Sequence, residues 1–372
     1  MSHLAPSSSR KIRSVWVSVT RVPRTLKEEI YVSQPPDFVD KDNPQYVCKL
    51  NKALYGLKQA PRAWYQELKT FLQTSGFKNS LANTSLFIYH NGNDYIYVLV
   101  YVDDIIITGV PSLVQAFQFA LAQRFSLKKL GPLSYFLGIE ATRSSRDMHL
   151  MQRKYIIDLP TKTRMLDAKP VATPMVTSPN LTIDSSTPLS DAKEYRAVIG
   201  SLQYLSFTWP NIAFVVNRLS QFMHQPTDKH WQAAQHVLHY LAGTKSHGIF
   251  LCSDATLTIH AFSDADWGRA HNTYTSTNAY IVYFGASTIS WSSKKQRSVS
   301  RSSTEAEYRA VANAASELRW ICSLLSEMGI VLLVAPVPYC DNVGATYLYA
   351  NTIFHTRMKH RVIDYHFVRE FI

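Results

Sequence analysis

The hydrophobic positions of the chain follow a helical period in some segments and a strand period in others. Apolar residues spaced three and four apart predict helices, because that spacing places them on one face. Helices are expected at residues 61–75, 112–125, 190–206, 210–224, 227–242 and 304–328. Runs of β-branched residues predict strands. Strands are expected in a hairpin at residues 96–108 and at 248–252, 257–263, 279–284, 287–292 and 337–340.

Breaker residues divide this pattern into parts. A Pro- and Thr-rich stretch at residues 169–188 predicts a linker. We therefore expect four segments: a basic leader at 1–27, an α+β domain at 28–160, a linker with a helical part at 161–247, and an α/β domain at 248–372. The leader has many basic residues and no acid, so we expect it to be disordered, with a transit peptide as the alternative.

Composition narrows the class of protein. With 372 residues and 46% hydrophobic residues, the chain can build packed cores, which excludes wholesale disorder. The 39 Lys and Arg against 27 Asp and Glu leave a net charge of +12, which favours an anionic partner such as nucleic acid or acidic lipid. The four cysteines are far apart, which argues against a disulfide framework or a Cys-rich zinc site. No apolar run has the length of a membrane span.

Two adjacent acids interrupt the most apolar segment of the chain. Asp103 and Asp104 lie between Val98–Val100 and Ile105–Ile107. Carboxylates inside a buried hairpin cost free energy unless a partner compensates their charge. A divalent metal such as Mg²⁺ does so through oxygen ligands. An ordinary turn, in which Asp side chains bind their own backbone, explains the same spacing, so both interpretations stay open here.

The motifs around this pair resemble a known family. Asp103 and Asp104 complete the tetrapeptide YVDD, which resembles the reverse-transcriptase box. Residues 54–65, LYGLKQAPRAWY, and residues 136–140, FLGIE, are similar to segments of copia-type retrotransposon polymerases. The resemblance implies a truncated reverse-transcriptase palm, in which the two acids are catalytic metal ligands, followed by a helical thumb or connection within residues 161–247. It also implies that Gln59 lies against the incoming nucleotide and template, and that FLGIE is the primer-gripping hairpin.

The polymerase site is nevertheless expected to be incomplete. Polymerases of this family carry a further catalytic Asp on a strand just before the segment that reads Glu29–Val32 here. Two metals that bridge a triphosphate need that acid. The preceding stretch, Ser14–Arg21, holds no carboxylate, and the fingers region expected earlier is not found.

A second set of motifs resembles the copia-type ribonuclease H domain. The boxes are SDADW at 263–267, ISWSSKKQ at 289–296, SSTEAEY at 302–308 and CDN at 340–342. Together with the first set, the resemblance covers roughly residues 28–372. It implies a mixed five-stranded sheet flanked by helices, in which Asp264, Glu307 and Asp341 converge as catalytic metal ligands.

Helical spacing chooses between the two acids of the SSTEAEY box. Glu307 shares a helix face with small residues that should pack on the sheet, so it is expected to point inward. Glu305 lies three after Ser302 and four before Arg309, which suits a capping box or a surface ion pair. We therefore take Glu307 as the candidate ligand and expect Glu305 on the outer face of the helix, in a structural role.

Two further acids need separate treatment. Asp341 ends a short strand before a helix and could be only an N-cap, although the two other acids aimed at the same place favour metal ligation. Copia-type chains end this domain with a KHIEIDxHFVRE-like run, and residues 359–370 read KHRVIDYHFVRE. Val362 therefore stands at the fourth acid position, and Asp364 could substitute as a catalytic residue.

Basic residues cluster directly after the ISWSS segment. Lys294, Lys295 and Arg297 are candidate nucleic-acid contacts, and an ordinary solvated cluster is the alternative. The net charge of +12 favours binding without sequence specificity.

Two functions from different classes fit these observations. The first is a retrotransposon-derived reverse transcriptase and ribonuclease H fragment whose C-terminal domain cuts the RNA strand of RNA–DNA hybrids with two Mg²⁺ or Mn²⁺ ions. The family implies RNA–DNA hybrid and single-stranded nucleic acid as partners, no membrane, and an intracellular place in a cytoplasmic particle or the nucleus. The alternative is a catalytically inactive nucleic-acid-binding remnant, which Val362 and the missing polymerase acid favour.

Overall fold

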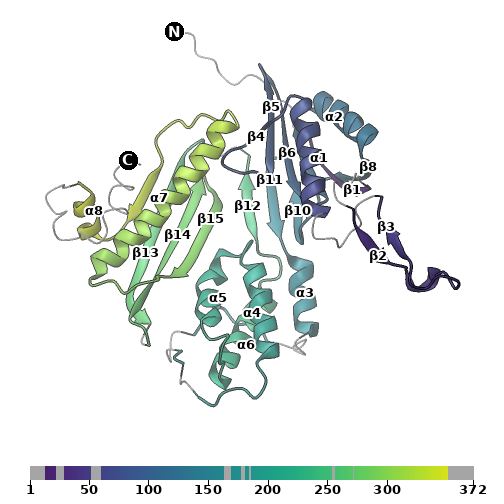
Figure 1. Ribbon diagram of the computed structural model, residues 1–372. Helices are drawn as coiled ribbons and strands as arrows, with labels where there is room; N and C mark the ends of the chain where they lie inside the picture. The colour runs from purple at the N-terminus through teal and green to yellow at the C-terminus, as the bar shows by residue number, and fades with distance from the viewer. Residues whose placement is uncertain are drawn as a thin grey trace, which may run out of the picture. The chain divides into compact units, whose positions relative to one another are not determined.

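The computed structural model describes residues 13–21, 29–51, 60–162, 169–176, 181–183, 186–253, 256–270 and 272–350. The chain forms two compact units, Met1–Leu133 and Ser134–Ile372. Each unit contains both sheet and helix, which confirms the expected mixture of α and β structure (Figure 1). Among the described helices, none has the length and apolar character needed to cross a membrane.

The first unit is a six-stranded sheet with two helices on one face. Its strands, in sheet order, are β4 (Lys78–Asn79), β5 (Leu86–Asn91), β6 (Asp94–Tyr101), β7 (Asp104–Gly109), β1 (Arg13–Arg21) and β8 (Ser126–Pro132). The helices are α1 (Ala60–Thr74) and α2 (Pro111–Arg124). Alternate residues of the central strands share one face and pack with the apolar stripes of both helices in one core. A separate hairpin joins β2 (Tyr31–Ser33) to β3 (Val47–Lys49) and contains the short helix η1 (Pro36–Phe38).

Strand β1 corrects the expectation that residues 1–27 are disordered. It lies between β7 and β8 and pairs antiparallel with both. Val15 and Val17 are buried in the core of the unit. The alternation of these valines with other residues is a strand pattern. Burying their side chains stabilises the strand, although the segment is rich in basic residues. The rest of the leader lies outside the described residues.

The second unit begins with a four-stranded sheet and a group of helices. The strands, in sheet order, are β12 (Ile249–Cys252), β11 (Asp147–Met151), β10 (Ile139–Arg143) and β9 (Tyr135–Phe136). The helices are α3 (Arg153–Lys162), α4 (Lys193–Leu205), η2 (Pro210–Ile212), α5 (Ala213–Ser220) and α6 (Asp228–Gly243), and they share a core around Tyr195 and Trp209. We expected β12 to open the last domain, but it pairs with β11 in this earlier sheet.

The last sheet has the order β15 (Ser287–Lys295), β14 (Thr275–Phe284), β13 (Ile259–Ala270) and β16 (Val337–Cys340). Strand β16 runs parallel to β13 and the other pairs are antiparallel, so the sheet is mixed. Helix α7 (Ser303–Glu327) packs on one face through Ala314 and Leu318, and α8 (Val343–Ala350) follows β16. Four strands are found among the described residues, where the resemblance implies five.

Val17 tests whether β1 belongs to the folded unit. Its side chain is fully buried, so Val17→Ala should lower the free energy of unfolding by roughly 2 kcal/mol through lost burial and a cavity. The matched control is Val47→Ala in β3, where the side chain is exposed and the change should stay within about 0.5 kcal/mol. Denaturant unfolding followed by tryptophan fluorescence measures both. Equal effects of the two substitutions would contradict the placement of β1.

Candidate functional site

The first pair of acids lies at the tip of the hairpin of β6 and β7. Tyr101 pairs with Asp104, so Val102 and Asp103 form a two-residue turn. Val102 has a φ of 51°, a conformation that β-branched residues rarely adopt and that persists only where the surroundings impose it. The indole N–H of buried Trp64 donates to the Val102 carbonyl at 2.6 Å. The turn therefore holds Asp103 exposed at the edge of the sheet.

The strand beside this pair carries no acid. In β1, Ser18 lies opposite Asp104 in the ladder with β7. The indole N–H of Trp16 donates to Asp104 Oδ1 at 3.3 Å, so a neutral donor contacts this carboxylate. Around Asp103 and Asp104, the described residues form no group of three metal-ligating side chains. Gln59, the expected nucleotide and template contact, lies outside the described residues.

The FLGIE segment forms the expected hairpin in the second unit. Strands β9 and β10 meet at a tight turn of Leu137 and Gly138, both with positive φ. The hydroxyl of Tyr204 in α4 donates to the Leu137 carbonyl. A side chain at Gly138 would collide with the Tyr204 ring, so this glycine is required by both its φ and the close approach. The hairpin is thus fastened to the helical part of the unit.

The second set of acids meets at one edge of the last sheet. Strands β13 and β16 run parallel, and Ser263 pairs with Cys340. Asp264 lies inside β13, opposite Ala279 of β14, and Asp341 directly follows β16, so the pairing of Ser263 with Cys340 places the two acids beside each other. Both side chains are exposed. The sheet topology thus brings together two acids that are far apart in the sequence.

Glu307 of α7 reaches the same edge from inside the protein. Its side chain is 6% exposed, and its Oε1 accepts a hydrogen bond from the Ala265 N–H at 3.1 Å. Burial, together with the negative charges of Asp264 and Asp341, raises the pKa of Glu307 to about 7, although the Ala265 N–H lowers it. The expectation that Glu307 points inward is confirmed. Asp264 and Asp341 are therefore close enough for their charges to act on Glu307.

Cys340 was not expected among these groups. Its Sγ lies 3.8 Å from Glu307 Oε2. One ligand atom each from Glu307, Cys340 and Asp341 lie within 4.8 Å of one another. Burial raises the pKa of the Cys340 thiol, and the nearby acids raise it further. Side chains alternate along β16, with Tyr339 exposed and Cys340 partly buried against α7, and this alternation was the sequence signal that could have placed it.

The donor set suits a divalent cation. Carboxylate oxygens are the ligands that Mg²⁺ and Mn²⁺ prefer. The raised pKa of Glu307 indicates that its negative charge is poorly compensated by protein groups alone. A cation held by Glu307 and Asp341, whose ligand atoms lie within 4.8 Å of each other, would compensate it, so these residues fit a metal ion. Asp264 is outside this group, although its charge acts on Glu307.

Asn342, and not Asp341, caps helix α8. The Ala345 N–H donates to Asn342 Oδ1 at 2.9 Å, which is the contact of an N-cap side chain. The N-cap interpretation of Asp341 is therefore wrong, because the next residue satisfies the end of the helix. The Asp341 carboxylate lies beside Glu307 instead.

Glu305 is buried, whereas we expected it on the outer face of the helix. It is 4% exposed, and its Oε1 accepts from the Arg309 guanidinium at 2.5 Å. Ser302 caps the helix by accepting from the Glu305 N–H at 3.2 Å, and Glu305 Oε2 accepts from the Arg301 N–H at 2.8 Å. The expected partners are present, but the segment at 296–301 covers this face of the helix.

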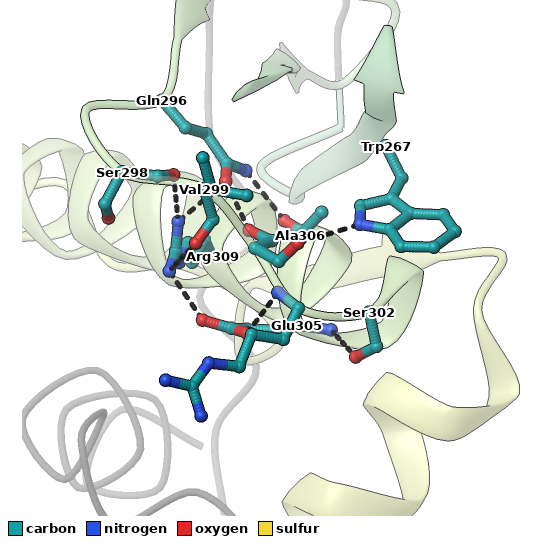
Figure 2. Close-up of polar contacts among 10 residues, drawn as sticks. Trp267, Gln296, Ser298, Val299, Ser302, Glu305, Ala306 and Arg309 are labelled. Atoms are coloured by element: carbon teal, nitrogen blue, oxygen red, sulfur yellow. Dashed lines mark hydrogen bonds and ion pairs between the residues drawn. The ribbon is translucent and has the colours of Figure 1, made fainter. Parts of the chain in front are cut away.

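Arg309 fastens that covering segment to α7. Its guanidinium also donates to Gln296 Oε1 at 3.0 Å, and the Gln296 amide donates to the Ala306 carbonyl at 3.0 Å. The indole N–H of Trp267 donates to the Ser300 carbonyl at 2.9 Å. Figure 2 shows these contacts around the first turns of α7. They fix the backbone from which the inward-pointing acid of this helix projects.

The remaining candidates have mixed outcomes. Lys294 and Arg297 are exposed and Lys295 is partly buried. Burial, and then the charge of Arg218, lowers the pKa of Lys295. Asp364, the candidate fourth acid, lies outside the described residues.

Comparisons with known proteins agree with these motifs. The family model described as "Reverse transcriptase (RNA-dependent DNA polymerase)" matches residues 1–177. The chain is 60% identical, over 98% of its length, to the retrovirus-related Pol polyprotein from transposon RE2 of Arabidopsis thaliana. It is 34% identical, over 99% of its length, to that from transposon TNT 1-94 of Nicotiana tabacum. The match covers 25% and 28% of these two relatives, so the chain spans about a quarter of their length.

A shorter relative is matched almost in full. The chain is 33% identical to a transposon Ty5-1 protein of Saccharomyces cerevisiae, over 79% of this chain and 97% of that protein. The similarity to transposon proteins therefore extends across both units.

The raised pKa of Glu307 predicts how stability depends on pH. An unfolded chain releases this proton near 4.5 and the folded chain near 7, so the stability of the fold should fall as pH rises between these values. After allowance for solvent screening, the loss should be about 2 kcal/mol. In a metal chelator, Glu307→Gln should therefore be more stable than the wild type at pH 8 and similar at pH 5, measured by denaturant unfolding.

Exposed Glu194 of α4 supplies the control for this measurement. Glu194→Gln should shift stability equally at both pH values. If the difference between wild type and Glu307→Gln is the same at pH 8 and pH 5, the inferred environment of Glu307 is wrong.

The buried pair of Glu305 and Arg309 makes a second prediction. Glu305→Gln leaves the guanidinium buried without its carboxylate and should cost about 3 kcal/mol of unfolding free energy. The double variant Glu305→Gln with Arg309→Met should recover part of this loss. The matched control is Glu67→Gln, which breaks the exposed pair with Arg124 and should cost less than about 0.5 kcal/mol. Similar costs for Glu305→Gln and Glu67→Gln would refute the buried pair.

Proposed function

Because the chain belongs to the copia-type retrotransposon Pol family, we propose that the part from β13 onward hydrolyses the RNA strand of RNA–DNA hybrids. The observation that carries this proposal is the approach of Glu307 and Asp341, whose ligand atoms lie within 4.8 Å of each other, with Asp264 close enough for its charge to act on Glu307. The net charge of +12 supports a polyanionic substrate. The partners would be RNA–DNA hybrid and single-stranded nucleic acid, and the place of action a cytoplasmic particle or the nucleus.

The three acids have distinct roles in this proposal. Bound Mg²⁺ or Mn²⁺ would supply an activated water and stabilise the leaving 3′ oxygen. Asp264 and Asp341 would hold the cations from neighbouring strands, where their exposed carboxylates are open to substrate. Glu307 would bind the cations from helix α7, on the buried side of the site. Its carboxyl group would release its proton to solvent when a cation binds. The 2′-hydroxyl would distinguish the RNA strand from DNA.

The fourth acid would be the weak point of the site. Val362 stands at the position of an acid in the family motif. Asp364, two residues later, would take the place of that acid as a metal ligand. We therefore propose slow hydrolysis. A catalytically inactive nucleic-acid binder is the second candidate, and Val362 is the observation that favours it.

We propose no DNA synthesis by this chain. Asp103 and Asp104 lie at the tip of a hairpin, where a polymerase would hold its metal ions. Gln59 would contact the nucleotide and template. However, the adjacent strand β1 carries no acid, and its contact with Asp104 is a hydrogen bond from the indole N–H of Trp16. This supports an incomplete polymerase site, because a metal pair needs a third carboxylate close by.

Cleavage of a labelled RNA strand annealed to DNA tests the proposal. The full chain with Mg²⁺ or Mn²⁺ should cut slowly, and Asp264→Asn should reduce cleavage to background because a central ligand is lost. Asp158→Asn, at an exposed position of α3, is the matched control and should cut like the wild type. Val362→Glu should raise the rate. Folded protein that cuts in none of these forms would favour the inactive binder.

A further inference from the structure

A polar groove lies between β15 and α7, separate from the carboxylate edge. Its volume is about 480 Å³, and none of Asp264, Glu307 and Asp341 lines it. Nearly all of the side chains that line it carry hydrogen-bonding groups or charges. A groove of this chemistry suits a polar ligand and offers little to an apolar one.

The groove has a positive and a negative end. Exposed Lys294 and Arg297 line one end. Glu317 lines the other, where its Oε1 accepts from the Ser290 hydroxyl at 2.6 Å. Arg309 and Glu317 stand eight residues apart on α7, which separates the two ends by about 12 Å. An anion is therefore attracted to the Lys294 end and repelled from the Glu317 end.

Asn278 adds a neutral donor at the positive end. It lies directly opposite Lys294 in the ladder of β14 and β15, and it is 5% exposed. Its side-chain amide lines the groove and makes no hydrogen bond to any residue that the structure describes. Because it lines the groove, this amide can donate a hydrogen bond to a ligand bound there.

The wall of the groove is held rigid. Gln296 and Arg309 are each 7% exposed, and they are hydrogen-bonded to each other and to nearby backbone. Arg297 therefore projects from a segment that is fixed against α7, and Lys294 projects from the end of β15 directly before it. A site built in this way loses little entropy when it binds its ligand.

We propose that this end of the groove binds one phosphate of a nucleic-acid backbone. A phosphodiester accepts charge-assisted hydrogen bonds from Lys294 and Arg297 and a neutral one from Asn278. The inference rests on the proposed function, since it names a contact for the same hybrid substrate. Arg309 follows Glu307 by two positions, so the groove and the carboxylate edge both lie near the first turns of α7.

Binding of a fluorescent RNA–DNA hybrid to the full chain in a metal chelator tests this site without catalysis. Lys294→Ala and Arg297→Ala should weaken binding, and each should reduce the slope of log K against log salt by about 0.7 to 0.9. Asn278→Ala should weaken binding about 5-fold with no change of slope, because the lost group is neutral. Glu317→Gln should tighten binding. Lys193→Ala, at an exposed position of α4, is the matched control and should bind like the wild type.

The outcomes separate the two proposals. If the wild type binds and the folded Lys294→Ala, Arg297→Ala and Asn278→Ala variants bind equally well, the groove is not a phosphate site and the proposed function stands. If the wild type binds no hybrid, both proposals fail. Inorganic phosphate should compete only weakly at matched ionic strength. Competition as strong as that of an unlabelled strand would overturn a backbone subsite in favour of a site for free phosphate.

Discussion

The second unit depends on one electrostatic constraint, the burial of Glu307 beside two other carboxylates. Its side chain is almost entirely covered, and its pKa is raised to about 7 by burial and by the charges of Asp264 and Asp341. A protein loses stability by holding acids in this way unless a proton or a cation neutralises them. The parallel pairing of β13 and β16 and the docking of α7 maintain that arrangement. The same edge of the sheet is therefore destabilising for the empty fold and well suited to bind a metal.

Glu305 and Glu307, two positions apart on α7, differ in how the protein compensates their charge. Glu305 has its charge compensated by Arg309 and its oxygens occupied by protein donors. Among the residues that the structure describes, Glu307 contacts one backbone N–H and a thiol, which leaves much of its hydrogen-bonding capacity open to a ligand. The buried pair also fastens the segment after β15 to the helix, and that segment carries Arg297 of the polar groove, whereas Lys294 lies near the end of β15. The structural acid therefore supports both surfaces that we assign to nucleic acid.

In the first unit, the two acids at the hairpin tip have no third carboxylate beside them among the described residues. Its YVDD turn keeps an energetically unfavourable φ at Val102, which Trp64 holds in place. Strain of this kind is typical of a site under functional constraint. The strand beside it provides an indole N–H from Trp16 to Asp104 where a metal site would need a further acid. The hairpin is thus retained while the neighbouring strand does not supply the charge that polymerase chemistry needs.

The sequence alone determined the family through its motifs. It also determined most helices and strands and the inward direction of Glu307, because the period of small and apolar residues reports which face of an element is covered. It could not determine which distant segment covers that face. Burial of Glu305 depends on the segment at 296–301, and the position of Cys340 depends on how β16 docks beside α7. Strand β1 was missed because its charge was given more weight than its alternating valines, whose burial between β7 and β8 needs the assembled sheet. Contacts between segments remote in sequence are decided by tertiary packing, since local periodicity carries no record of the partner.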